Sequence, residues 1–167
     1  MNNDTYEVVR ADEAGIAVEK IVSLYHSLIG QEGCTWSVDY PDYGTIANDY
    51  QKGNLYCLLS ETKELMAAVS VCDDPDVDNL PCWSEECLPA GDAMRVAVAA
   101  SYQNHGIARV MLTHAMKILK ERGYKGIHFL VSKTNARAIA SYKKLNFNCV
   151  GEVDMFDEHW WCYERKL

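Results

Sequence analysis

The sequence predicts a single domain of the α/β class, and three observations support this prediction. Apolar runs of strand length alternate with longer segments whose apolar residues recur at the spacing of one helix face. The 167 residues match the size of one domain, and 49% hydrophobic with 24% charged residues is typical of a globular protein. The elements do not alternate regularly enough for a doubly wound dinucleotide-binding fold.

The N-terminal half is expected to form three strands and two helices. Asp12 is a candidate N-cap for the first helix, and Gly30 follows its last apolar residue. The second helix is expected to turn Tyr43 and Ile46 inward. The expected strands are 5–10, 55–60 and 65–71, with a hairpin turn at 61–64, and the expected helices are 12–30 and 41–52.

The C-terminal half is expected to form four strands and two helices. Gly123 ends the pattern of the longer helix, and Asn135 is placed to cap the shorter one. The expected strands are 94–99, 127–131, 148–153 and 160–166, and the expected helices are 107–122 and 135–145.

The stretch 94–120 predicts an anion-binding site. A strand leads through a short loop onto the start of a long helix, where backbone N–H groups lack helical partners and the helix dipole favours negative charge. Gly106 lets the backbone approach a ligand closely because it has no Cβ. Arg109 adds a cation in the first helical turn.

The net charge of −8 argues against a nucleic-acid partner and is concentrated in one segment. Residues 73–92 include seven carboxylates and no Lys or Arg. This segment could be a solvated loop, or it could attract a cationic acceptor. A calcium loop formed by Asp74, Asp76, Asp78 and Glu85 is disfavoured, because Asn79 stands where such a loop needs Gly.

The cysteine pattern predicts neither a disulfide framework nor a metal site. The seven cysteines are odd in number and include no Cys-x-x-Cys pair. No stretch approaches the roughly 20 apolar residues of a membrane span. The first residues lack the basic and apolar regions of a signal peptide, so we expect a cytoplasmic protein without a membrane partner.

Two motifs carry a resemblance to a known family. Gln103-x-x-Gly106-x-Ala108 resembles the pyrophosphate-binding signature of the GNAT superfamily of N-acetyltransferases. A second family pattern, Asn-x-x-Ala-x-x-x-Tyr-x-Lys-x-Gly-Phe, is matched farther along the chain, except that Asn146 replaces its Gly. The matching residues are Asn135, Ala138, Tyr142, Lys144 and Phe147.

The resemblance implies one GNAT-like domain over residues 1–167, with acetyl-CoA as cosubstrate. It implies a mixed, twisted sheet of about six to seven strands, flanked by about four helices, in which the fourth and fifth strands are parallel and splay apart. The opening would hold the pantetheine arm. The implied cofactor-binding residues are Val96, Ala97, Val98, Gln103, Asn104, His105, Gly106, Ile107, Ala108, Arg109, Asn135, Ala138 and Lys144.

The implied reaction is direct attack of a primary amine on the thioester. Tyr142 stands where the family places its general acid. The general base stays open among Asp73, Glu85, Glu86 and Asp92, either directly or through water.

The expected acceptor is a small cationic amine. Trp36, Trp83 and Tyr43 could bind it by cation–π contact, and Glu85 and Glu86 by charge. A protein N-terminus or lysine as acceptor, a non-catalytic acyl-CoA sensor, and a homodimer all remain open.

Overall fold

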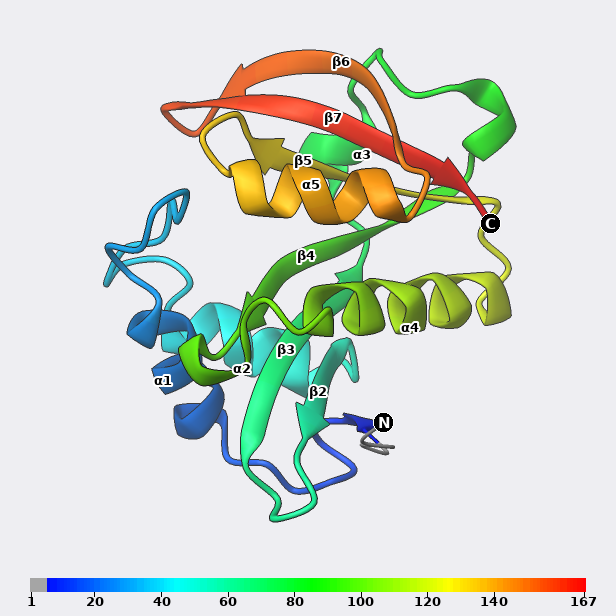
Figure 1. The fold of residues 1–167 in the computed structure, drawn as a ribbon. Coiled ribbons are helices and arrows are strands. Elements are labelled where there is room, and N and C mark those ends of the chain that lie inside the picture. The colour runs from blue at the N-terminus through cyan, green and yellow to red at the C-terminus, as the bar shows by residue number, and fades with distance from the viewer. Residues whose placement is uncertain (1–5) are drawn as a thin grey trace.

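The computed structural model describes residues 6–167, which form one seven-stranded sheet with helices on both faces (Figure 1). The strand order is β1-β2-β3-β4-β5-β7-β6. The strands are β1 (Glu7–Arg10), β2 (Leu55–Leu59), β3 (Leu65–Cys72), β4 (Ala90–Val98), β5 (Gly126–Ser132), β6 (Asn148–Met155) and β7 (Glu158–Lys166). The helices are α1 (Val18–Ser27), α2 (Tyr43–Gln51), α3 (Pro75–Asp78), α4 (Ile107–Glu121) and α5 (Ala136–Lys144).

The middle of the sheet is incompletely paired. Strands β4 and β5 are parallel, whereas the other neighbours are antiparallel. The pairing of β4 with β5 joins residues 90–92 to residues 126–128, and its last pair is Asp92 with His128. Beyond this pair the two strands diverge (Figure 1). The expected mixed sheet with splayed fourth and fifth strands is therefore confirmed.

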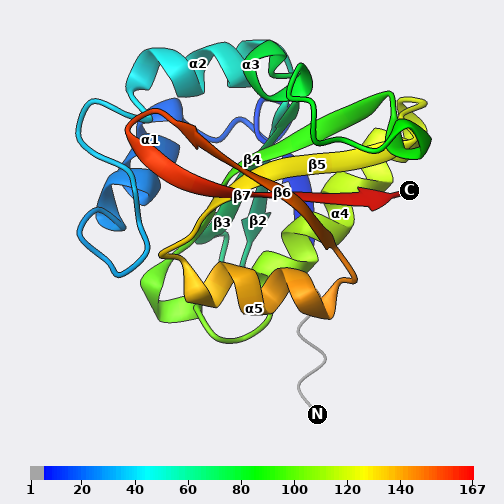
Figure 2. The same ribbon diagram turned by 90° about the horizontal axis from the view of Figure 1, so that it is seen from above.

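Two apolar layers hold the helices to the sheet. Helices α4 and α5 cover one face, and α1, α2 and α3 lie on the other (Figure 2). Met111 and Leu119 of α4 are fully buried against the first face, as the helical spacing predicted, and so is Leu112, which the predicted face did not include. Ile21 and Ile46 are fully buried against the second. The helices therefore pack against both faces of the sheet on either side of the point where β4 and β5 diverge.

Two predictions near the N-terminus are wrong. Asp12 does not cap α1: its carboxylate accepts two hydrogen bonds from Arg10, and the helix begins at Val18. Tyr43 is not inward, because α2 begins at Tyr43 itself and leaves that side chain 52% exposed. Thr5, the first residue of the expected first strand, lies outside the described residues.

The acidic segment is more ordered than the sequence predicted. It contains α3 and a 3-10 turn at Glu85–Cys87, and β4 begins at Ala90, four residues before the expected start. Pro75 does not prevent helix formation. It occupies the first turn of α3, where a backbone N–H would have no helical partner, so its missing N–H costs nothing. Because β4 starts early, Asp92 belongs to the sheet.

The expected hairpin and the second motif helix are confirmed. β2 and β3 pair around the 61–64 turn. The Asn135 carboxamide accepts the Ala138 N–H at 3.1 Å and so caps α5. Asn146, in place of the family glycine, adopts φ +57° after that helix. All seven cysteines are free. Among residues 6–167, no helix combines the length and the apolar character needed to cross a bilayer.

Candidate functional site

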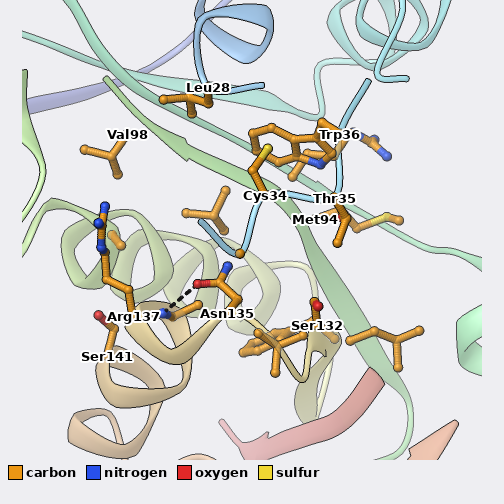
Figure 3. Close-up of a pocket in the computed structure, with 18 of the residues that line it drawn as sticks. Leu28, Cys34, Thr35, Trp36, Met94, Val98, Ser132, Asn135, Arg137 and Ser141 are labelled. Atoms are coloured by element: carbon orange, nitrogen blue, oxygen red, sulfur yellow. Dashed lines mark hydrogen bonds between the residues drawn. The ribbon is translucent and has the colours of Figure 1, made fainter. Parts of the chain in front are cut away.

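A cavity of about 810 Å³ opens where β4 and β5 diverge. Its walls come from β4, β5, α5, the start of α4, the loop after α1 and the β6–β7 turn. Figure 3 shows Cys34, Thr35 and Trp36 of the loop on one side of this space and Arg137 and Ser141 of α5 on the other. Asn135, the N-cap of α5, lies against the same loop at Gly33. The diverging strands therefore open a cavity that several elements surround.

Residues of the expected anion site line one part of the cavity. Gly106 caps α4 with φ +79°, and Asn104 also has a positive φ of +65°. No hydrogen bond within residues 6–167 uses the backbone N–H groups of residues 104–108. These donors and the positive end of the 15-residue helix suit a diphosphate.

A polar network prepares this part of the cavity, and the sequence did not predict it. The Gln103 side-chain amide donates to Gln31 Oε1 and to the Val98 carbonyl, both at 3.0 Å. Its oxygen accepts from Arg137. Arg137 is an exposed cation on the cavity wall, and Gln31 reaches the loop from the end of α1. Arg137 occupies an unspecified position of the second motif, so only its charge could have indicated it.

Most of the expected cofactor-binding residues line the cavity. Ala97 does not, because it faces the core under α1 and can offer only backbone groups. His105 turns its ring back to the Gln103 carbonyl, 2.7 Å away, and lies beside a different hollow. Neither Arg109 nor Lys144 is among the described lining residues. The expected residues that do line it are Val96, Val98, Gln103, Asn104, Gly106, Ile107, Ala108, Asn135 and Ala138.

Tyr142 lines the cavity from α5 and is 8% exposed. Its ring packs edge-on against Phe129 with the ring centres 4.7 Å apart. Burial raises the pKa of Tyr142, so the phenol stays protonated at neutral pH. No hydrogen bond within residues 6–167 engages its hydroxyl, which leaves that group available to a ligand.

A bulge in β4 shapes the cavity wall. Met94 lies opposite Ser70 but Ala97 opposite Ala68, so β4 carries one extra residue, and Arg95 takes φ +53° there. The Arg95 guanidinium pairs with Asp49, and both side chains are 8% exposed. The Arg95 carbonyl accepts the Tyr25 hydroxyl at 2.7 Å. These contacts from α1 and α2 hold a strained residue in place.

Five carboxylates from several elements line the cavity. Asp74 and Asp92 lie near the start of β4, Asp157 and Glu158 lie at the β6–β7 turn beside the end of β5, and Glu32 lies in the loop after α1. Trp36 also lines the cavity. Among the expected acceptor-binding residues, Tyr43, Trp83, Glu85 and Glu86 are not among the described lining residues. Both glutamates belong to the 3-10 turn, and Glu86 lies 3.8 Å from Lys166 at the end of β7.

Asp92 belongs to a buried polar cluster. It is 1% exposed, and its Oδ1 lies 3.4 Å from His128 Nε2, which is 2.7 Å from Asp78 Oδ1. Burial, with the neighbouring Asp78, raises the pKa of Asp92 to about 7 despite the opposing effect of His128. Burial alone would lower the pKa of His128, but the adjacent carboxylates of Asp92 and Asp78 raise it. Asp92 is therefore a buried carboxyl with a raised pKa beside the cavity.

Splayed parallel strands next to an anion-binding helix start define the N-acetyltransferase class of fold. The family model for the acetyltransferase (GNAT) family matches residues 21–147, and the chain belongs to this family. The expectation drawn from the two motifs is thus confirmed.

Solved structures share this fold at low sequence identity. The PaiA N-acetyltransferase from Thermoplasma acidophilum, in complex with coenzyme A, has a TM-score of 0.73 and 13% identity, covering 98% of this chain and 99% of that one. Ard1 from Thermoplasma volcanium gives 0.71 and 12%, with 97% of each chain covered.

A sequence relative is the ribosomal protein bS18-alanine N-acetyltransferase of Escherichia coli. It is 40% identical over 61 residues, which are 36% of this chain and 41% of that protein. The match therefore spans about two fifths of the relative's length. The structure of the Escherichia coli enzyme superposes with a TM-score of 0.62 at 19% identity, covering 98% of this chain and 93% of that one.

Proposed function

We propose that this protein is an acetyl-CoA-dependent N-acetyltransferase that acts on a primary amine. The observation that carries the proposal is one cavity lined by the start of α4, whose first backbone N–H groups have no partner among the described residues, and by five carboxylates. The unpaired edge of β4 and the hydroxyl-bearing Tyr142 line the same cavity.

The cofactor would lie along β4. The free N–H groups of residues 104–108 bind the diphosphate, and Arg137 adds a cation. The pantetheine amides pair with the backbone of Val96 and Val98, because β5 supplies no partner beyond Asp92. Asn135 keeps α5 in place through its cap and contacts the arm.

The reaction needs a proton acceptor for the amine and a donor for the leaving thiolate. Of the four base candidates, Asp92 is the one that lines the cavity, whereas Asp73 is bound by the Tyr124 hydroxyl at 2.7 Å. A carboxyl with a pKa of about 7 can take the ammonium proton near neutral pH.

Bond changes then follow in order. The neutral amine nitrogen attacks the thioester carbonyl, backbone N–H groups of β4 stabilise the oxyanion, and the C–S bond breaks. The nitrogen releases its extra proton to the departing thiolate, directly or through water, so the products are the amide and free CoA thiol. The Tyr142 hydroxyl donates to the departing sulfur. Its raised pKa makes full proton transfer costly, so its main contribution is a hydrogen bond to the developing thiolate.

The acceptor we favour is a small cationic amine, because five carboxylates line the cavity. A protein N-terminus is the second candidate. It is supported by the partial sequence match to an enzyme named for acetylating the alanine of a ribosomal protein. We expect neither nucleic acid nor a membrane as partner.

An amine panel tests the proposal. Thiol release from acetyl-CoA is followed with polyamines, simple alkylamines, lysine and short peptides with an N-terminal alanine, while calorimetry measures CoA binding. Transfer to any primary amine supports the enzyme, and the preferred group identifies the acceptor class. CoA binding without transfer to any amine would favour the acyl-CoA sensor, and the lack of CoA binding would refute both.

A further inference from the structure

A buried cluster of metal-ligand type lies beside the cavity. Asp78, Asp92 and His128 each offer one ligand atom, and the three atoms lie within 4.8 Å of one another. We propose that these residues bind a divalent transition-metal ion of the Zn²⁺ type. The sequence analysis predicted no metal, so this proposal departs from it.

The two carboxylates are already oriented for a shared ligand. The backbone N–H of Asp74 donates to Oδ2 of Asp78 at 3.1 Å and to Oδ2 of Asp92 at 3.2 Å. Because one donor holds both outer oxygens, both Oδ1 atoms are directed at His128 Nε2. Hydrogen bonds that fix ligand carboxylates in this way are typical of metal sites.

The imidazole is also held in place. The Trp83 ring stacks on it with the centres 4.3 Å apart, and Trp83 Nε1 donates to the Val77 carbonyl at 2.8 Å. The His128 side chain is 1% exposed. A ring clamped this firmly presents Nε2 at a fixed point, so binding requires little reorganisation.

One ligand atom is left unsatisfied in the metal-free protein. Asp92 Oδ1 accepts no hydrogen bond although the residue is 1% exposed. A bound cation would satisfy this buried acceptor and neutralise both carboxylates. The unmet oxygen is an observation independent of the clustering, and it points into the same space as the other two ligand atoms.

The donor set favours zinc over calcium or magnesium. One imidazole nitrogen with two carboxylate oxygens suits Zn²⁺ and its neighbours, whereas Ca²⁺ and Mg²⁺ prefer more oxygen ligands. Three protein ligands leave a fourth position, and Asp92 lines the cavity, so water or an amine from the cavity could fill it. If the proposed function holds, a metal on Asp92 blocks proton transfer, and zinc inhibits the enzyme reversibly.

The test measures metal binding without CoA or amine. Zn²⁺ is titrated against a chromophoric chelator with the wild-type chain, Asp78→Asn and His128→Gln. The matched control is His159→Gln, which alters an exposed His–Asp pair, His159 with Asp154, that has no third ligand. We expect at least tenfold weaker binding in both cluster variants and wild-type affinity in the control. Equal affinity in all four proteins would overturn the site.

Cobalt distinguishes this site from the free cysteines. Co²⁺ on nitrogen and oxygen ligands gives weak visible bands, whereas thiolate ligation adds a strong near-ultraviolet charge-transfer band. A thiolate band in the wild-type protein at one equivalent would contradict the proposal. This reading needs no variant, so it stands even if His128→Gln fails to fold. Asp78 is 27% exposed, so Asp78→Asn is expected to fold.

The two proposals fail separately. CoA binding and amine transfer without tight zinc binding would remove the metal site and leave the enzyme intact. Zinc binding that depends on Asp78 and His128, without transfer to any amine, would uphold the site and remove the proposed function.

Discussion

Replacing Asp92 by asparagine should abolish most activity while making the protein more stable at pH 8. The carboxyl is 1% exposed, and burial raises its pKa from 3.8 to about 7. Each tenfold change in the protonation equilibrium corresponds to about 1.4 kcal/mol, so the ionised form in the fold costs about 4 kcal/mol as an upper bound. An amide of the same shape carries no such cost.

The sign of the pH dependence follows from the direction of that pKa change. A carboxyl whose folded pKa is raised binds its proton more tightly in the native state, so its contribution to stability decreases as pH rises from about 4 to about 7. Asp92→Asn should therefore gain on the order of 1–4 kcal/mol at pH 8 and nothing at pH 4. For catalysis, the wild-type kcat/KM should rise with pH and level off above about 7.

The assays are urea unfolding at pH 4 and pH 8 in metal-free buffer, and thiol release with the best amine of the panel. A general base contributes roughly 10²–10⁴ to the rate, so kcat should fall by that factor in the variant. Loss of activity together with loss of stability at pH 8 would show that Asp92 is structural. Full activity would remove it from the mechanism.

Three further changes test other parts of the account. Tyr142→Phe should lower kcat at least tenfold with little change in acetyl-CoA affinity by calorimetry, because the lost hydroxyl acts on the departing sulfur; unchanged turnover would exclude it. Arg137→Ala should weaken CoA binding about tenfold, because the Arg137 charge faces the diphosphate end of the cavity. Arg137→Gln should bind CoA as weakly as Arg137→Ala, and Arg137→Lys should recover part of the affinity. Equal affinities in all variants would contradict this role. Gly126→Ala should destabilise the fold by about 1–3 kcal/mol in urea unfolding, because its Cβ would lie 2.4 Å from the Cys87 carbonyl oxygen; an unchanged midpoint would refute this packing.

The fold was predictable from local patterns because the residues that set it are near one another in sequence. The helical spacing of Met111 and Leu119 indicated the buried face of α4, although it missed Leu112, and Asn135 indicated the start of α5. Errors occurred where a distant or competing partner decided the outcome. The Asp12 carboxylate accepts two hydrogen bonds from the Arg10 guanidinium instead of capping the backbone N–H groups of a first helical turn.

The candidate site was predictable only where a motif marked it. Gly106 and Tyr142 stood in recognisable patterns, and both line the cavity. His128 lies in an apolar strand and meets Asp78 only because β5 passes under α3, fifty residues away in sequence. No spacing rule connects the two. The charge of Glu85 and Glu86 suggested that they line the acceptor pocket. They lie instead in a 3-10 turn, outside the described cavity lining, and local charge could not indicate this.

The short contact between β4 and β5 has a consequence for how the cofactor affects the fold. Within residues 6–167, only three pairs of strand residues in the β-ladder connect the four-stranded half of the sheet to the three-stranded half. A pantetheine arm laid along β4 would act as the missing rungs of that ladder. CoA should then raise the melting temperature, and the gain in stability should grow with the logarithm of the CoA concentration above its Kd. Amide exchange should slow in both β4 and β5 when CoA binds.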